Sequence, residues 1–387
     1  MMLESKLPNV GETIFTTIST LANKHNAINL GQGFPDFEMN QGLIELVNIA
    51  MKEGYNQYAN SSGSIKLRET ISKKIESLYQ KNIDPNGEIC ITPGATYAIY
   101  TAITAIIHPG DEVIVFEPAY DSYVPNIMVN GGIPVLITLE TPDFKIDWDL
   151  VRKKISGKTR MIIINSPHNP TGAILDKTDF EALQSIVKDT NIVLVSDEVY
   201  EHITFDEKKH QSVLSFPELF SRSFVTYSFG KVYNCTGWKI GYCVAPANLM
   251  CEFLKIHQFN AFSTSSFVQE GLANFLEDKE QYLSLAGFLQ AKRDLFSDLL
   301  SESLLKPLPS FGTYFQLYDY STLSDSREID FAKKLTTDAG VAAIPVSAFY
   351  QEEKNQSLLR FCFAKKESTL IAAAGRILKY EKTLTKN

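Results

Sequence analysis

Several runs of β-forming residues each end in polar side chains that can do chemistry. One run ends in Asp197 and is followed by Tyr200, and another ends at Ser228, just before Lys231. In an open α/β sheet, ligands bind beyond the carboxyl ends of the strands. We therefore expect an acid, a tyrosine, a serine and a lysine to meet at one edge of a sheet.

Other runs add hydrogen-bond donors at the same edge. Asn169 follows one run, within the sequence NSPHNPTG, and Tyr120 follows another. A further run leads into Gly94, Ala95 and Thr96, where a helical pattern begins. The free N–H groups of a helix N-terminus bind phosphate, so the sequence predicts a phosphate site here.

A lysine, an acid and a phosphate site together favour pyridoxal 5′-phosphate as cofactor. Its aldehyde reacts with a lysine amine, and an acid beside the pyridine nitrogen keeps that nitrogen protonated, which makes the ring an electron sink. Each feature alone is common, because loop lysines and N-cap acids occur in most proteins. Their ordered occurrence is the informative signal. No G-x-G-x-x-G follows a strand, so a dinucleotide site lacks its main support.

The elements that carry these residues alternate between strand and helix. The expected strands are 88–92, 111–118, 133–140, 160–165, 191–197 and 223–228. Most are apolar at both odd and even positions, which is typical of parallel strands covered by helices on both faces. Helical patterns intervene at 94–107, 147–155 and 176–188. The pattern predicts a doubly wound α/β sheet.

After residue 247 the pattern changes to long helices followed by scattered strands. Helices are expected at 248–259, 265–276, 281–305 and 368–384, and strands at 313–320, 341–346 and 358–364. We expect a smaller α+β domain. The predicted division is an N-terminal arm with part of the small domain (1–40), a large cofactor-binding domain (41–283) and a small C-terminal domain (284–387).

Composition excludes several classes of protein. The 387 residues include 37 Lys and Arg against 45 Asp and Glu, a net charge of −8, which disfavours nucleic-acid binding. Five cysteines without a C-x-x-C pair, and histidines without ligand spacing, predict no disulfide framework, no metal site and a cytoplasmic location. Residues 89–110 lack charge, but Pro93, Gly94 and His108 interrupt them, so we expect no membrane span.

Over nearly its whole length the chain resembles the class I, fold-type I pyridoxal-phosphate aminotransferases. It is most similar to the subgroup that holds kynurenine and glutamine transaminases and bacterial methionine aminotransferases, and TIFTTIS and CFAKKESTL indicate the methionine branch. The matching stretches are TIFTTISTLA (13–22), INLGQGFPDF (28–37), NQYA (56–59), FEPAYDSY (116–123), NSPHNPTG (165–172), SDEVYEHI (196–203), SFGKVYNCTGWKIGYCVAP (228–246) and LLRFCFAKKESTL (358–370). The resemblance implies a mostly parallel central sheet with helices on both faces, plus a smaller α+β domain.

The resemblance also implies roles for the residues around the cofactor ring. Lys231 would bond to the cofactor aldehyde and, once freed, move a substrate proton. Asp197 would pair with the ring nitrogen, Tyr200 and Asn169 would donate to the ring hydroxyl oxygen, and Tyr120 would lie against the ring face.

For the phosphate, the resemblance implies Ala95, Thr96, Ser228 and Lys239, with Tyr58 reaching in from a neighbouring subunit. The active sites would then be shared within a homodimer. Lys239 stands where many relatives have arginine, which keeps the charge but loses the bidentate geometry.

For the substrate, the resemblance implies that Arg360 binds the α-carboxylate bidentately, helped by Asn169 and the backbone of Gly33. Phe15, with Phe262 from the partner chain, would line the side-chain pocket. We can place no second arginine there, which disfavours a dicarboxylate specialist. The expected reaction is ping-pong transfer of the amino group of methionine, or of an aromatic or glutamine-like amino acid, to a 2-oxo acid.

Alternatives remain open at this stage. A kynurenine or glutamine transaminase, or a cysteine-S-conjugate β-lyase, would share every cofactor residue. Phe15 and Ser263 stand where kynurenine enzymes have Trp and His, which favours flexible, sulfur-containing or aromatic substrates. A non-catalytic effector-sensing module ranks last, because Lys231 is retained and no helix-turn-helix extension is present.

Overall fold

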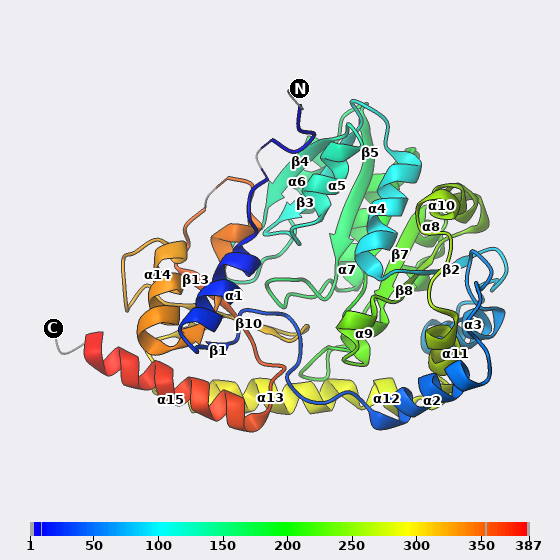
Figure 1. The fold of residues 1–387 in the computed structure, drawn as a ribbon. Helices are drawn as coiled ribbons and strands as arrows, with labels where there is room; N and C mark the ends of the chain where they lie inside the picture. Colours follow the sequence, from blue (N-terminus) through cyan, green and yellow to red (C-terminus); the bar gives the residue numbers. More distant parts are fainter. Residues whose placement is uncertain (1–3, 9, 353, 385–387) are drawn as a thin grey trace.

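A seven-stranded sheet forms the centre of the molecule (Figure 1). The computed structural model describes residues 4–8, 10–352 and 354–384. In spatial order the strands are β2 (Ile89–Thr92), β8 (Gly241–Val244), β7 (Ser223–Ser228), β6 (Val193–Asp197), β5 (Thr159–Asn165), β3 (Glu112–Glu117) and β4 (Ile133–Thr138). Strand β8 runs antiparallel to both of its neighbours, and the other pairs are parallel.

Helices pack against both faces of this sheet, as predicted. Strand β5 shows why its sequence is apolar throughout. Ile162 and Ile164 belong to one buried cluster, which includes side chains of α2, α3, α6, α7 and α11, whereas Met161 and Ile163 belong to another with α4, α5 and α10. These helices are α2 (Gln41–Lys52), α3 (Ile65–Tyr79), α4 (Ala95–Ile106), α5 (Tyr123–Val129), α6 (Trp148–Lys154), α7 (Lys177–Val187), α10 (Ala247–Asn260) and α11 (Ser266–Phe275).

A third buried cluster surrounds a smaller four-stranded antiparallel sheet. Its strands, in spatial order, are β12 (Ile344–Pro345), β13 (Leu358–Cys362), β10 (Phe315–Asp319) and β9 (Lys306–Pro307). The helices around it are α1 (Ile14–Lys24), α13 (Leu285–Leu299), α14 (Glu328–Lys334) and α15 (Glu367–Leu384). Near the N-terminus, β1 (Ile28–Asn29) pairs in parallel with β11 (Val341–Ala342). This pairing joins the N-terminal segment to the part of the chain around residue 341, while the domain boundaries at 41 and 284 stay a prediction.

Three expectations about elements were wrong. The strand predicted at 341–346 is divided into β11 and β12, which lie in different sheets. The predicted helix 281–305 is instead α12 (Glu280–Leu283) followed by α13, which ends at Leu299. At the break, the Ser284 hydroxyl donates to the Glu280 carbonyl at 2.6 Å, competing with regular helical bonding. Strand β8 was not predicted, since four residues between two glycine- and proline-containing turns give too short a signal.

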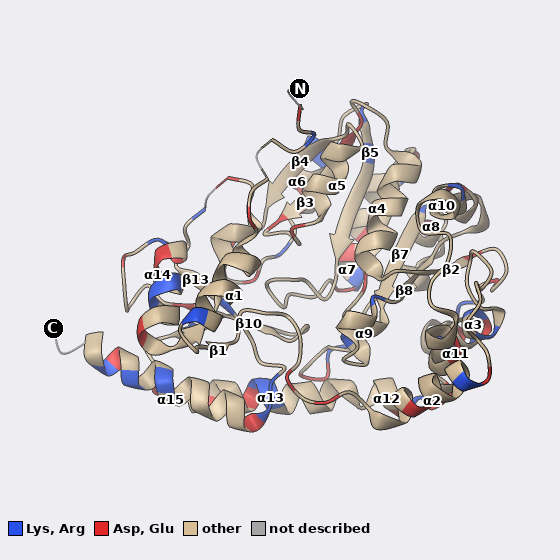
Figure 2. Ribbon diagram, viewed as in Figure 1, with Lys and Arg blue, Asp and Glu red and all other residues tan. Residues whose placement is uncertain are grey.

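The uncharged stretch 89–110 forms β2, a turn and α4 rather than one long helix. Among the residues that the structure describes, no helix is long and apolar enough to cross a membrane. Figure 2 shows charged residues of both signs interspersed along peripheral helices such as α14 and α15, whereas the central strands carry few of them. The remaining short helices are α8 (Pro217–Phe220) and α9 (Phe229–Val232).

Candidate active site

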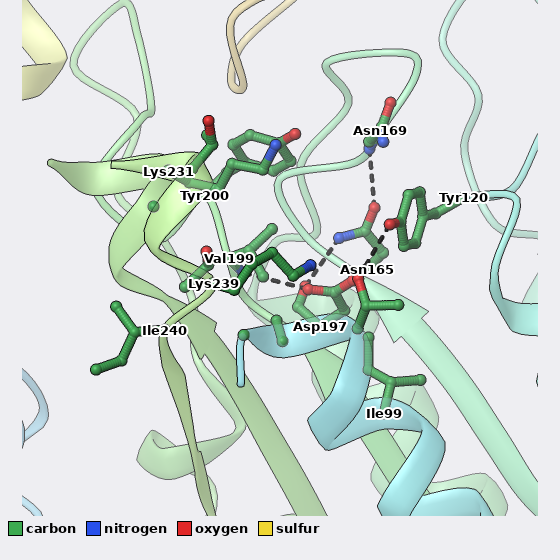
Figure 3. Close-up of a pocket in the computed structure, with 16 residues that line it drawn as sticks. Ile99, Tyr120, Asn165, Asn169, Asp197, Val199, Tyr200, Lys231, Lys239 and Ile240 are labelled. Atoms are coloured by element: carbon green, nitrogen blue, oxygen red, sulfur yellow. Dashed lines mark hydrogen bonds between the residues drawn. The ribbon is translucent and has the colours of Figure 1, made fainter. Parts of the chain in front are cut away.

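The carboxyl ends of β5, β6 and β7 surround one cavity of about 170 Å³, together with the start of α4 (Figure 3). The cavity collects nine of the residues that the sequence predicted for the cofactor. They are Ala95, Thr96, Tyr120, Asn169, Asp197, Tyr200, Ser228, Lys231 and Lys239. In Figure 3, Tyr120 and Asn169 lie on one side of Asp197, and Lys231 and Tyr200 lie on the other.

Asp197, the last residue of β6, is buried and held by several donors. The Tyr123 hydroxyl donates to its Oδ2 at 2.6 Å, and the Val199 N–H donates to Oδ1 at 3.3 Å. The Asn165 side chain also binds the Asp197 carbonyl at 2.9 Å. Burial raises the pKa of Asp197 to about 6. A buried carboxylate gains from a cationic partner, so this group fits a protonated pyridine nitrogen.

Lys231 lies in α9, directly after β7. Its Nζ is 3.0 Å from the Tyr314 hydroxyl and 3.4 Å from the Gly33 carbonyl. Burial lowers the pKa of Lys231 to about 8, although Asp197 opposes the shift. A substantial fraction of the amine is therefore neutral just above neutral pH, as a nucleophile or base requires.

The start of α4 forms a cradle for a phosphate. Gly94 caps the helix with φ +82°, a conformation that favours glycine, and no side chain caps the N-terminus. A Cβ on Gly241 would lie 2.4 Å from the Tyr227 carbonyl and 3.1 Å from the Ala95 nitrogen, so only glycine lets β8 approach the helix so closely. Lys239 lines the same cavity, and this combination fits an anionic group.

Arg360 of β13 is only 2% exposed and reaches the site from the smaller sheet. Its Nη1 donates to Asn169 Oδ1 at 2.7 Å, and its Nη2 donates to the Gly31 carbonyl at 3.1 Å. Its Nε has no hydrogen-bond partner among the described residues. Burial lowers the pKa of Arg360 to about 10, so the group stays charged near neutral pH. A buried cation with an unpaired donor fits a carboxylate ligand.

Three aromatic rings surround this guanidinium. The Arg360 Cζ lies 3.8 Å from the ring centre of Phe315, 4.8 Å from that of Phe349 and 5.4 Å from that of Phe15. The predicted residues Phe15 and Gly33 are thus brought close to Arg360 and Lys231, respectively. The rings give the substrate end of the site largely apolar walls.

Tyr58 is the predicted cofactor-binding residue that does not line this cavity. Its side chain is 85% exposed and packs edge-on against Phe262, with ring centres 5.4 Å apart. Its role would need a second subunit and stays a prediction. Within the described part of the chain, no group of three or more His, Cys, Asp or Glu side chains is arranged to hold a metal ion.

Sequence reasoning missed several residues of the site. Asn165 accepts from the Asn169 N–H at 2.8 Å, and it stands at the end of a predicted strand, a position that could have identified it. Tyr123 lies inside the quoted sequence FEPAYDSY but had no assigned role. Tyr314 lies in the predicted strand 313–320 and Phe349 follows the predicted strand 341–346, but both belong to the smaller domain, away from the sheet edge where ligands were expected.

Comparisons with known proteins identify the family. Residues 25–377 match the model described as aminotransferase class I and II. The chain is 47% identical over 375 residues to the methionine aminotransferase of Escherichia coli (strain K12), covering 97% of each chain. It is 34% identical over 399 residues to human kynurenine–oxoglutarate transaminase 3, covering 95% of this chain and 88% of that one.

Structural comparison gives the same answer. The crystal structure of a methionine aminotransferase from Escherichia coli matches with a TM-score of 0.96 and 46% identity, covering 98% of this chain and 100% of that one. This likeness confirms the expected fold-type I architecture, a mostly parallel sheet with helices on both faces. The chain therefore belongs to the class I and II aminotransferase family.

Proposed function

We propose that this aminotransferase uses pyridoxal 5′-phosphate and takes the amino group of methionine, which it gives to a 2-oxo acid. The observation that carries the proposal is the single cavity in which a lysine amine, a buried acid and a helix N-terminus meet. Those are the three groups that the cofactor's aldehyde, ring nitrogen and phosphate require.

Each group of the cofactor has a partner in this assignment. Asp197 would hold the ring nitrogen, and the start of α4 with Ser228 and Lys239 would hold the phosphate. The Lys231 amine would bond to the aldehyde. When bound, the cofactor supplies an electron-withdrawing ring that makes the α-hydrogen of an attached amino acid acidic.

The chain's own residues then bind the substrate and move a proton. Arg360 binds the substrate carboxylate through its unpaired Nε and its outer nitrogens. Lys231 acts as the base at the substrate α-carbon, and its lowered pKa keeps part of the amine neutral for this task. The buried surroundings exclude water from the proton transfer.

The choice of methionine rests on two supports. The Escherichia coli relative that carries this activity is 47% identical over almost the whole chain. The rings of Phe15, Phe315 and Phe349 also offer apolar contacts to a flexible or aromatic side chain. Kynurenine is the second candidate donor, since a kynurenine transaminase is among the relatives.

We further propose that the enzyme is a homodimer with shared active sites. Tyr58 and Phe262 form an exposed aromatic pair, which is the kind of surface that a second subunit covers. A mixture of Lys231→Ala and Tyr58→Ala chains should then form some dimers with one intact site and recover activity. The cytoplasmic location stays a prediction.

A panel of amino donors tests the function. With a 2-oxo acid present, the protein with cofactor should turn over methionine faster than any other amino donor. In a separate spectral experiment, methionine alone should change the absorbance of the protein with cofactor, and adding the oxo acid should restore it. Faster turnover of kynurenine or glutamine would overturn the proposed donor. Pyruvate and ammonia released from a cysteine conjugate without any oxo acid would instead indicate a β-lyase.

A further inference from the structure

Tyr314 connects three parts of the chain at the reactive lysine. It stands just before β10, with its side chain 1% exposed. Its hydroxyl lies 2.7 Å from the carbonyl oxygen of Gly33 in the N-terminal segment, and 3.0 Å from Nζ of Lys231. Its ring packs edge-on against Tyr200, with ring centres 5.3 Å apart. The hydroxyl is therefore held in one place by the packing of its ring.

The partners of this hydroxyl fix the direction of each hydrogen bond. A carbonyl oxygen can only accept, so the single proton of Tyr314 goes to Gly33. Toward Lys231 the hydroxyl oxygen must then act as acceptor, and the lysine donates an N–H. The second neighbour of Nζ, the Gly33 carbonyl at 3.4 Å, is also an acceptor.

A neutral amine has two N–H groups and one lone pair. When both N–H groups point at the oxygens of Tyr314 and Gly33, the lone pair points away from them. Lys231 also lines the cavity that holds Asp197 and Lys239, which leaves the cavity as the space open to that lone pair.

We propose that Tyr314 is a positioning residue that aims the Lys231 amine into the cavity and holds its N–H groups. The proposal rests on the proposed function only in taking Lys231 as the reactive lysine. It also ties the lysine to Gly33, whose backbone was predicted to contact the substrate carboxylate. Loss of the phenolic oxygen would leave the amine with a single, longer contact.

The loss should also change how tightly Lys231 binds its proton. An ammonium donates a stronger hydrogen bond than an amine does. Removing the acceptor therefore disfavours the charged form, and the pKa of Lys231 should fall. The charged and titratable groups that face Lys231 from neighbouring elements would remain in place in a phenylalanine variant. They are Cys362, Arg360, Asp197 and Lys239, together with Tyr200, whose ring centre lies 5.8 Å from the Lys231 Nζ.

Competitive labelling of the apoprotein measures this directly. Acetic anhydride reacts only with the neutral amine, so the extent of labelling of the Lys231 peptide against pH gives the pKa of that lysine. In Tyr314→Phe we expect this pKa to lie about one unit or more below the wild-type value. Tyr318→Phe is the matched control, because Tyr318 is a buried tyrosine of β10 whose ring packs on Phe296 and Phe361.

An unchanged labelling curve in Tyr314→Phe, or an equal shift in Tyr318→Phe, would overturn the proposal. Tyr314→Leu, which also has no acceptor, should give the same fall as the phenylalanine variant. In the loaded enzyme, kcat should drop on the order of tenfold while KM for the amino acid stays near its original value. The labelling uses no cofactor, so the two proposals can fail separately. If the labelling curve shifts in Tyr314→Phe but the wild-type protein does not bind the cofactor, the proposed function is refuted and the positioning role stands.

Discussion

Removing one hydroxyl, in Tyr123→Phe, should change how the enzyme binds its cofactor at different pH. The Tyr123 hydroxyl donates to Oδ2 of Asp197 at 2.6 Å, in a fully buried setting. Such a bond favours the ionised carboxylate, and a hydrogen bond to a charged group is worth roughly 1.5–3 kcal/mol. At about 1.36 kcal/mol per pKa unit, its loss should raise the pKa of Asp197 by about one to two units.

The sign of the effect follows from the value in the native protein. Burial places the pKa of Asp197 at about 6, so the carboxyl is mostly ionised at neutral pH. In Tyr123→Phe the pKa should lie about one to two units higher, which leaves between about half and a tenth of the carboxyl ionised at neutral pH. Only the carboxylate pairs with a protonated ring nitrogen, so cofactor binding should weaken about two- to tenfold there and recover at higher pH.

The assay is a titration of the apoprotein with pyridoxal 5′-phosphate across a range of pH, for both proteins. The titrations of the cofactor itself are the same in both, so the displacement between the two Kd profiles reports on Asp197. Tyr320→Phe is a suitable control, because it also removes the hydroxyl of a buried tyrosine, one that donates to the Ser326 carbonyl at 2.8 Å. Superimposable profiles for the wild type and Tyr123→Phe would refute the reasoning.

Three further variants or conditions test other parts of the structure. Arg360→Ala should raise KM for the amino acid by at least tenfold, because roughly 1.5–3 kcal/mol of charged hydrogen bonding is lost; steady-state kinetics measure this, and an unchanged KM would exclude Arg360 from the substrate site. Lys74→Met should destabilise the fold by about 3 kcal/mol in urea unfolding, since it removes the lysine cation from the buried Glu201 carboxylate, which keeps only Tyr79, Tyr242 and His202 as partners. The double variant Lys74→Met with Glu201→Gln should recover much of that loss, and equal stabilities of the single variant and the wild type would contradict the argument. The rate of cofactor capture by the apoprotein should rise as pH rises towards 8, because the pKa of Lys231 is lowered to about 8 and only the neutral amine attacks. Stopped-flow absorbance measures this rate, and a rate that does not change between pH 6 and 8 would contradict the lowered but still titrating amine.

Local sequence signals identified six of the seven strands of the large sheet and missed β8. Strand β5 is apolar at every position from Met161 to Ile164, and helices do bury both of its faces. The same reasoning placed Asp197, Ser228 and Lys231 at one sheet edge, because the ends of parallel strands must meet there. The positions of most strands and the chemistry at their ends are therefore readable without a structure, whereas the order of the strands was not predicted.

Contacts between distant parts of the chain were not readable in this way. Tyr314 bonds to Lys231 across 83 positions, and Arg360 bonds to Asn169 across 191. Strand periodicity does not reveal which side chain of the smaller sheet faces the larger one, because that depends on how the two pack. The family resemblance suggested Arg360 but gave no role to Tyr314 or Tyr123.

Chemical trapping of the cofactor tests the central claim most directly. The protein is mixed with pyridoxal 5′-phosphate, reduced with borohydride, digested, and its peptides are examined by mass spectrometry. The structure predicts a single phosphopyridoxyl group, on the peptide that contains Lys231, and none in Lys231→Ala. Modification of a different lysine, or equal modification of the variant, would contradict the assignment of Lys231 and of the cavity around it.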